Sequence, residues 1–533
     1  MQGRHQGFAE LEISLFRIYM SRGELCPSLK PNLLLSTKNR VVRRENIYLI
    51  IIIALGFFLR SWDLGWNGFN GDESIYSGQA ASLLGEQDFL KDFAVFRAHP
   101  LLLQSLLSVA FAFFGVHDTV ARAIPVIFGT LSIFITYLLA KELFDRKVGL
   151  VSSLVLALLP FHIVFSRQVL LDVPLSFFVI LFLYFITKFK ITERNIYSYW
   201  TGVSCGLCLI SKEVGIIMLP IFVAYSFITH TLKPRKFVVF LIGFAFAISP
   251  YVLLILIRRD AVNAFFTYAS FQANREATIL SSRYASTLIN EAFGYVLSIL
   301  IIVSVLLILI ECRSTGSRKY RDQIILLVIA LGTLFLFYQL LPSQGDRFLI
   351  TLMPIGVILG CSFLVTNYVN RLNKRKVIYI CLIPLIILSN NFFISKLLPV
   401  DELRLSDNIG TPWKREVALW IKNNTPPDAN VLTAQMTMAN VIRFYSNHEV
   451  YTFELSSNPS YIRLDNPALL ILNKNVSIIV EDRDPALEQN PVVADLKKYR
   501  AYFNPHLVYT AYKYNTENGT DERIPMIAVY QLK

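Results

Sequence analysis

Two adjacent carboxylates, Asp72 and Glu73, lie just after the first long apolar stretch of the chain, in the segment Gly71 to Tyr76. A charged carboxylate beside a bilayer is costly unless it faces water or a partner, so this placement indicates a function. A positioned carboxylate can act as a general acid or base on a bound molecule. The structural alternative for Asp72 is a helix cap, because Gly-Asp is also a common helix start.

Further polar side chains recur in loops that we expect on the same side of the membrane as this pair. The candidates for a shared site are His99, Arg167, Asp172, Lys212, Arg283, Tyr284 and Arg347. Since carboxylates lie in the early loops and cations in the later ones, cations can hold an anionic headgroup while a carboxylate acts on a partner beside it. Structural alternatives stay open. Lys212 and Arg347 also suit interfacial anchors, Asp172 before Val-Pro suits a helix start, and His99 before a proline suits a structural role.

The composition is that of an integral membrane protein. Of the 533 residues, 54% are hydrophobic and only 17% are charged, with a mean hydropathy of +0.49, whereas soluble domains carry roughly 25% charged residues. The net charge of +13 comes from short basic clusters between apolar runs, which is the pattern of cytoplasmic loops rather than of a nucleic-acid-binding surface. The six cysteines indicate no disulfide framework, and Cys205 and Cys208 suit helix packing better than a metal site.

The basic clusters also set the topology. Residues 1–45 are basic, lack a signal-peptide core and are expected to form a cytoplasmic tail, with Met20 as an alternative start. We expect the transmembrane part at 46–397 and its first outer loop at 63–120. Residues 101–115 are expected to lie flat on the outer surface. If they crossed instead, the charged cluster at 141–147 would lie outside, against the positive-inside rule.

With residues 101–115 flat at the surface, the sequence predicts about eleven transmembrane spans, with the amino terminus inside and the carboxyl terminus outside. The expected spans are 46–62, 121–140, 148–165, 173–188, 196–210, 214–231, 237–257, 289–310, 323–341, 348–368 and 377–397.

Residues 398–533 change character and predict an α/β domain outside the membrane. Short β-branched runs at 430–433, 476–480 and 526–530 alternate with helix-like segments such as 413–423, which follows Thr-Pro. The expected fold is therefore a multi-span α-helical membrane protein with a C-terminal extracytoplasmic α/β domain.

Several segments of the first half resemble one family. They are 71–76 (GDESIY), 99–101 (HPL), 122–131 (RAIPVIFGTL), 139–144 (LAKELF), 159–162 (LPFH) and 166–174 (SRQVLLDVP). Their order and spacing are similar to those of the dolichyl-phosphate-mannose protein mannosyltransferases. That group includes the bacterial aminoarabinose transferases and, more distantly, the oligosaccharyltransferase catalytic subunit, all of the GT-C class. The resemblance covers residues 46 to about 230.

The resemblance implies a GT-C fold in the cell membrane and transfer of a sugar, mannose-like or another hexose or pentose, from a polyprenyl-phosphate carrier. The acceptor is a hydroxyl of a protein, lipid or glycan at the outer face, and the anomeric carbon is inverted. Such activity belongs to protein glycosylation or to the cell envelope.

The same resemblance assigns roles to residues. Asp72 matches the general base, a role that contributes about 10²- to 10⁴-fold. Lys212 and Arg347 match phosphate-binding cations, and Asp172 matches a second acidic loop. Three roles stay open for Glu73, namely orienting the acceptor, binding a metal or capping the following helix. The remaining candidate substrate contacts are His99, Arg167, Arg283 and Tyr284. No cofactor is required, although a divalent metal held by Asp72 and Asp172 stays open.

Two other classes of function compete with a transferase. A transporter or lipid carrier usually places ionisable groups at mid-membrane in broken helices, whereas here they gather at one face. A receptor or scaffold would bind through the outer domain and leave the loop carboxylates idle.

Overall fold

The structure is a computed structural model of the chain. It describes residues 31–96, 99–231, 233–258, 262–264, 266, 267, 270, 282–315, 321–341, 345–365, 383–390, 412–453, 471–483, 487, 490–515 and 522–532. The chain divides into two compact units, Met1–Ile52 and Ile53–Lys533. The helix α2 (Pro31–Ser61) begins inside the tail predicted at 1–45, so residues 31–45 are helical. The rest of that tail lies outside the described residues.

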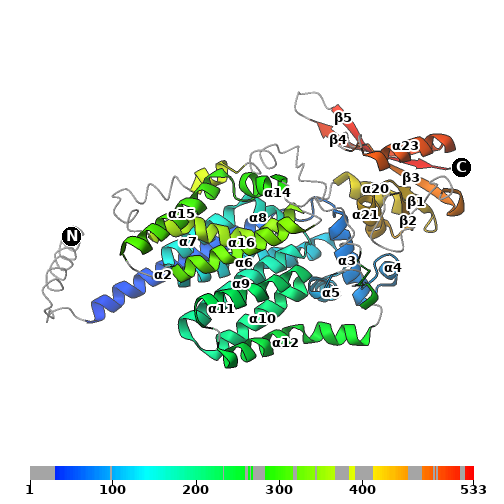
Figure 1. Cartoon of the computed structure of the whole chain (residues 1–533). Coiled ribbons are helices and arrows are strands. Elements are labelled where there is room, and N and C mark those ends of the chain that lie inside the picture. Colours follow the sequence, from blue (N-terminus) through cyan, green and yellow to red (C-terminus); the bar gives the residue numbers. More distant parts are fainter. Residues whose placement is uncertain are drawn as a thin grey trace. The chain divides into compact units, whose positions relative to one another are not determined.

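Residues 71–365 of the second unit are helical wherever the structure describes a regular element (Figure 1). The elements are α3 (Gly71–Leu84), α4 (Gln87–Leu90), α5 (Leu102–Phe114), α6 (Asp118–Leu143), α7 (Arg146–Leu158), α8 (Pro160–Phe165), α9 (Asp172–Thr192), α10 (Asn195–Ser211), η1 (Glu213–Ile217), α11 (Met218–Ile228), α12 (Pro234–Ile257), α14 (Ser282–Thr287), η2 (Leu288–Ala292), α15 (Tyr295–Thr315), α16 (Arg321–Leu340), η3 (Asp346–Leu352), α17 (Met353–Cys361) and η4 (Ser362–Val365).

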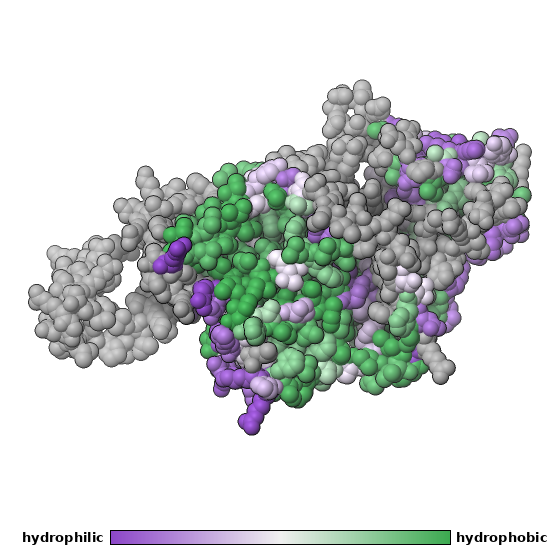
Figure 2. All heavy atoms as spheres, in the orientation of Figure 1, coloured by the Kyte–Doolittle hydropathy of each residue, from purple (hydrophilic) through white to green (hydrophobic). Residues whose placement is uncertain are grey.

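Four helices of the described chain, α6, α9, α12 and α16, are long and apolar enough to cross a membrane. A fifth candidate is the pair 284–292 and 295–310, which is bent by 99°. Apolar side chains cover much of the helical face seen in Figure 2, as expected for a surface in contact with lipid. The described residues of the first ten predicted spans are mostly helical, with turns or breaks at 62, 159, 229–231, 293–294 and 341, whereas 366–368 and most of 377–397 lie outside the described residues. The total of about eleven spans stays a prediction.

The helix α5 is too short to cross a membrane. Its 13 residues extend about 20 Å at 1.5 Å per residue, against a hydrocarbon core of about 30 Å. It packs against α3 and α6, so the predicted outer loop 63–120 folds as a layer of short helices. This length agrees with the expectation that residues 101–115 lie at the surface.

The helices α10 and α12 pack with their backbones in close contact. A Cβ added to Gly202 would lie 2.0 Å from the carbonyl oxygen of Phe240, and one added to Gly243 would lie 2.2 Å from that of Tyr199. Small residues allow such close approach between membrane helices. Cys205 and Cys208 are buried on α10 as free thiols, in keeping with the packing role expected for them.

The C-terminal part forms a three-layer α/β structure. Its sheet has the order β2-β1-β3-β5-β4, in which β1, β2 and β3 are parallel and β5 runs antiparallel to β3 and β4. The strands are β1 (Asn430–Thr433), β2 (Val450–Thr452), β3 (Val476–Asp482), β4 (His506–Asn515) and β5 (Glu522–Gln531); the helices are α20 (Pro412–Asn424), α21 (Met436–Ser446) and α23 (Pro491–Phe503). The three predicted β-branched runs lie in β1, β3 and β5. The expected boundary at 398 lies outside the described residues.

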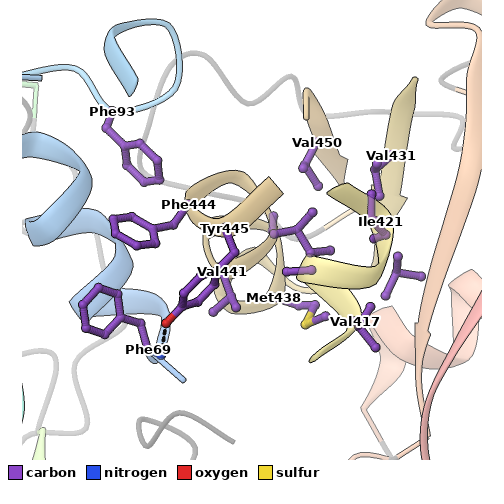
Figure 3. Packing of buried hydrophobic residues seen from close by; sticks show 14 of the residues in the cluster. Phe69, Phe93, Val417, Ile421, Val431, Met438, Val441, Phe444, Tyr445 and Val450 are labelled. Carbon is purple, nitrogen blue, oxygen red and sulfur yellow. Dashed lines mark hydrogen bonds between the residues drawn. The ribbon is translucent and has the colours of Figure 1, made fainter. Parts of the chain in front are cut away.

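Strand alternation builds a core on each face of this sheet. Val431 and Ile478 pack with α20 and α21 on one face, and their neighbours Leu432 and Ile479 pack with α23 on the other, because successive strand residues point to opposite sides. The first of these cores continues into the outer loop, where Phe69 is among the residues buried with it (Figure 3). The α/β part and the outer loop therefore share one hydrophobic core.

Candidate active site

The start of α3 is fixed by a capping box, which sets the direction of both loop carboxylates. The Asn70 side chain accepts a hydrogen bond from the Glu73 backbone N–H at 2.9 Å, and the Glu73 side chain accepts one from the Asn70 backbone N–H at 3.1 Å. This reciprocal pair satisfies two donors that a helix start leaves free. Asp72 is the second residue of the helix and points about 100° away from Glu73 around its axis.

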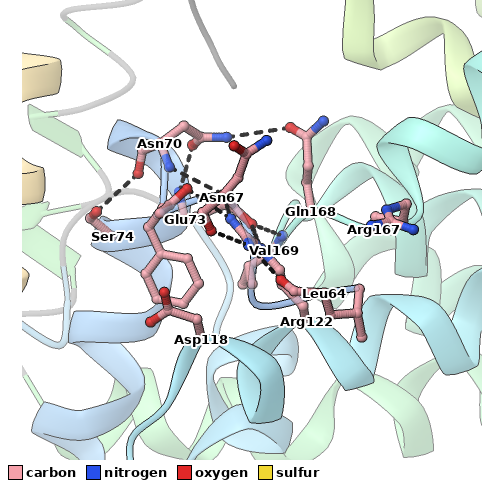
Figure 4. A network of polar contacts seen from close by, with 12 residues as sticks. Leu64, Asn67, Asn70, Glu73, Ser74, Asp118, Arg122, Arg167, Gln168 and Val169 are labelled. Atoms are coloured by element: carbon pink, nitrogen blue, oxygen red, sulfur yellow. Dashed lines mark hydrogen bonds and ion pairs between the residues drawn. The ribbon is translucent and has the colours of Figure 1, made fainter. Parts of the chain in front are cut away.

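Glu73 is fully buried and anchors three segments (Figure 4). One carboxylate oxygen accepts hydrogen bonds from Arg122 Nε at 2.8 Å and from the Val169 N–H at 3.0 Å. The other accepts from Arg122 Nη2 at 2.8 Å and from Asn70. Arg122 also donates to three carbonyl groups of residues 64–68. Four donors thus occupy both oxygens, and through them Glu73 caps the helix and ties the loop together.

Asp72 belongs to a separate charged chain of four residues, which runs through Arg347 and Asp172 to Lys212. Arg347 Nη1 pairs with Asp72 Oδ2, and Arg347 Nε lies 3.5 Å from Asp172 Oδ2. Lys212 Nζ donates to Asp172 Oδ1 at 2.8 Å. Charges of opposite sign therefore alternate along the chain.

Helix ends bring these four residues together. Asp172 is the first residue of α9, and Lys212 follows the last residue of α10 in an extended conformation. Arg347 lies in the 3₁₀ segment η3, and the next residue, Phe348, places its ring 3.8 Å from Lys212 Nζ.

The chain of charges is open to solvent at one end only. The side chains of Asp172 and Lys212 are 3% and 6% exposed, whereas those of Asp72 and Arg347 are 28% and 18% exposed. The Asp72–Arg347 end is therefore the accessible one, and the Asp172–Lys212 pair supports it from inside.

The charges also fix the protonation of the accessible pair. Burial raises the pKa of Asp72, but the charge and hydrogen bond of Arg347, with the charges of His99 and Lys212, outweigh it and lower that pKa below its ordinary value. Burial acts to lower the pKa of Arg347, but Asp72, Tyr76 and Asp172 together raise it. Asp72 is therefore an ionised carboxylate at neutral pH and can accept a proton.

A histidine–carboxylate pair lies next to this site. His99 Nδ1 is 2.8 Å from Glu213 Oε2, and the His99 ring lies edge-on to Tyr76 with 6.2 Å between ring centroids. The sequence did not single out Glu213. Its position could have indicated a site residue, because Glu213 directly follows Lys212 and begins an apolar segment.

Known proteins resemble this chain in part of its sequence and in most of its fold. The sequence model of the dolichyl-phosphate-mannose-protein mannosyltransferase family matches residues 98–254, less than a third of the chain. An uncharacterized protein from Aquifex aeolicus is 25% identical over 189 residues, which are 34% of this chain and 37% of that protein.

Among solved structures, apo ArnT from Cupriavidus metallidurans matches with a TM-score of 0.61 and 15% identity, over 93% of this chain and 98% of ArnT. The oligosaccharyltransferase of Archaeoglobus fulgidus, in complex with Zn and sulfate, matches with a TM-score of 0.55 and 15% identity, over 89% of this chain and 72% of that chain. The chain has the GT-C glycosyltransferase fold. The resemblance expected from the sequence is thereby confirmed, and the apolar helices of the described chain agree with a multi-pass membrane location.

Two further expected site residues, Arg167 and Tyr284, are not members of the charged chain, although Tyr284 lies near enough to Asp172 to interact with it electrostatically; a third, Arg283, is described only in its backbone. Arg167 donates to the carbonyl groups of Leu59 and Asp63, at 3.2 and 3.3 Å, and so holds the loop that precedes α3. Tyr284 is buried in the helical part, with its ring stacked 6.3 Å from that of Phe335. Arg283 has a helical backbone in α14, and its side chain lies outside the described residues.

The two aspartates of the charged chain do not fit a metal ion. Asp72 and Asp172 both pair with Arg347, so a cation already lies between the two expected ligands. Within the described ranges, no group of three or more His, Cys, Asp or Glu residues is arranged to hold a metal. Arg347 therefore supplies the positive charge that a metal would bring to these carboxylates.

Proposed function

We propose that this chain is a glycosyltransferase that moves a sugar from a polyprenyl-phosphate carrier to an acceptor hydroxyl at the non-cytoplasmic face, with inversion at the anomeric carbon. The observation that carries the proposal is the Asp72–Arg347 pair, supported from inside by Asp172 and Lys212. Glycosyl transfer needs a base for the acceptor and a positive charge for the departing phosphate. This site offers both side by side.

The proposed reaction is a single displacement. The acceptor hydroxyl oxygen attacks the anomeric carbon as its proton passes to a carboxylate oxygen of Asp72. The bond between that carbon and the phosphate oxygen breaks, and the polyprenyl phosphate leaves with the electron pair. Arg347 and Lys212 match the charge that develops on the phosphate, and the guanidinium group of Arg347 can bind two phosphate oxygens at once.

Arg347 links the two halves of this reaction. The donor phosphate and Asp72 are both anions, so they compete for the same guanidinium group. When Arg347 turns toward the phosphate, Asp72 loses part of the interaction that lowers its pKa. The carboxylate then becomes a stronger base at the stage when an acceptor must be deprotonated. Donor binding thus prepares Asp72 for the acceptor.

The position of the charges supports a transferase over a transporter. In α6, α9, α12 and α16 the Asp, Glu, Lys and Arg residues lie near the helix ends, and Asp172 of the charged chain is the first residue of α9. Transporters instead place these groups at mid-membrane. The donor class agrees with a structural neighbour, because ArnT from Cupriavidus metallidurans bound to undecaprenyl phosphate matches with a TM-score of 0.58 and 15% identity, over 90% of this chain and 98% of ArnT.

The test is sugar transfer by purified protein in liposomes, with radiolabelled polyprenyl-phosphate sugars and a panel of protein, lipid and glycan acceptors. We expect Asp72→Asn to lower the transfer rate by about 10²- to 10⁴-fold while polyprenyl phosphate still binds. Asp88→Asn is the matched control, since Asp88 is an exposed carboxylate of the same outer loop, and it should leave the rate unchanged. Unchanged transfer by Asp72→Asn would remove the assigned base, and no transfer with any donor would favour a lipid carrier.

A further inference from the structure

The α/β part of the chain holds the turn that leads into the helix bearing Asp72. Tyr445, on α21, points its hydroxyl group at this turn (Figure 3). Its hydroxyl group accepts a hydrogen bond from the Phe69 backbone N–H at 2.8 Å and donates one to Asp118 Oδ2 at 2.6 Å. Phe69 immediately precedes Asn70, the residue that caps α3. One hydroxyl group of the C-terminal part thus joins Phe69, the residue before the helix cap, to Asp118, the first residue of α6.

Two further contacts fix the same turn. Arg415, on α20, donates to the Gly65 carbonyl oxygen at 3.1 Å, and a Cβ added to Gly68 would lie 2.5 Å from Arg415 Cβ. Gly71 lies against Thr437, at the start of α21, where an added Cβ would come within 3.0 Å of the threonine Cα. The backbone from residue 65 to 71 therefore lies directly on α20 and α21.

Aromatic packing supplies the remaining attachment. The Phe444 ring lies 5.0 Å from the ring of Phe69, 5.3 Å from that of Phe89 and 6.4 Å from that of Phe93. These ring contacts bury the interface between the outer loop and α21, and they need no hydroxyl group. The hydroxyl group of Tyr445 fixes the orientation of the turn. It accepts a hydrogen bond from the Phe69 N–H, and its own hydrogen bond to Asp118 holds the hydroxyl group in place.

We propose that Tyr445 is a positioning residue, through which the α/β domain aims Asp72 at Arg347 and at the acceptor. The expected effect on the transfer rate rests on the proposed transferase function. The expected effect on the turn at residues 69–74 does not depend on that function. A base must be within hydrogen-bond reach of the proton that it removes, and a misplacement of about 1 Å can cost about 10²-fold in rate. The C-terminal domain is thereby part of the catalytic machinery rather than a cover over it.

The experiment replaces Tyr445 by Phe, which keeps the ring and removes the hydroxyl group. We expect kcat for transfer to fall by about 10-fold or more while KM for the polyprenyl-phosphate donor does not rise, since Arg347 and Lys212 are kept and a displaced Asp72 competes less with the phosphate for Arg347. Amide hydrogen exchange should become faster at residues 69–74 and stay unchanged in α16. Tyr502→Phe is the control, because Tyr502 is 74% exposed, and it should change neither quantity.

The outcomes separate this proposal from the proposed function. If the wild-type chain transfers sugar and Tyr445→Phe has the same kcat, or if exchange at residues 69–74 is unchanged, the positioning role is overturned. Faster exchange over the whole of α20 and α21 also contradicts it, since the hydroxyl group would then hold the domain together. If the wild type transfers no sugar from any donor, the proposed function fails, and local exchange still decides whether Tyr445 holds the turn.

Discussion

The two neighbouring carboxylates should respond differently when each loses its charge, and Glu73→Gln is the sharper test. Both oxygens of Glu73 accept hydrogen bonds, from Nε and Nη2 of Arg122 and from the backbone N–H groups of Asn70 and Val169. A glutamine amide has only one acceptor oxygen, so its NH₂ group must face donors. Arg122 would also remain buried without its counter-charge.

The magnitude follows from this burial. Removing one partner of a buried ion pair costs about 3–5 kcal/mol, a large part of the roughly 5–15 kcal/mol by which a typical domain is stable. Asp72→Asn removes one partner of a pair whose side chains are 28% and 18% exposed, but Asp172 still faces Arg347, so the loss of stability should be smaller than for Glu73→Gln. Its expected rate loss of about 10²- to 10⁴-fold corresponds to about 2.7–5.4 kcal/mol of activation free energy. One substitution should thus act mainly on stability and the other on rate.

The assay compares both variants with wild type in detergent. The fraction of protein that stays monodisperse after heating reports stability, and single-turnover transfer at a low temperature reports rate. We expect Glu73→Gln to lose monodispersity at a clearly lower temperature than wild type, and Asp72→Asn to lie closer to the wild-type heating profile than Glu73→Gln does. A Glu73→Gln protein as stable as wild type but inactive in transfer would refute the reasoning, because Glu73 would then be a reactive group.

Two further predictions concern charge and packing. Arg347→Met should move the acid limb of the pH–rate profile to higher pH, because Arg347 lowers the pKa of Asp72 and the base works only when ionised; an unmoved limb in single-turnover rates would contradict this. Gly202→Ala should lower thermal stability by about 1–3 kcal/mol, the usual cost of overpacking, because the added Cβ would lie 2.0 Å from the Phe240 carbonyl oxygen. Gly332→Ala, with nothing within 4 Å of the added Cβ, is the control, and equal heating profiles for the two glycine variants would contradict the packing argument.

Residue type and periodicity located most of the long helices and three of the five strands. Apolar runs of 15–22 residues found the helices and β-branched runs found β1, β3 and β5, because both patterns are local, whereas β2 and β4 were not predicted. The breaks were not predicted. Residues 148–165 were expected as one span, but the helix is interrupted at Leu159, before Pro160. The buried Arg60 donates to the carbonyl groups of Leu156 and Ala157 at 3.1 Å, a contact from another helix that no local pattern contains.

The sequence supplied the members of the site but not their partners. Asp72, Asp172, Lys212 and Arg347 were all expected at one face, since positive-inside topology sorts loops by side. Which cation meets which carboxylate depends on how helix ends pack, and this is tertiary information. For the same reason the role of Arg122 in neutralising Glu73 was not foreseen, although both residues lie in segments that carry the family resemblance.

The hydrogen bonds around α3 have a consequence for biosynthesis. Asp72 meets an arginine 275 positions further along the chain, and the turn before it is held by a tyrosine hydroxyl group 376 positions after Phe69. During synthesis the first loop therefore cannot form these contacts until Arg347 and then Tyr445 have been added to the chain. A chain that stops before residue 445 lacks Tyr445 and therefore the hydrogen bond that holds the Phe69 N–H.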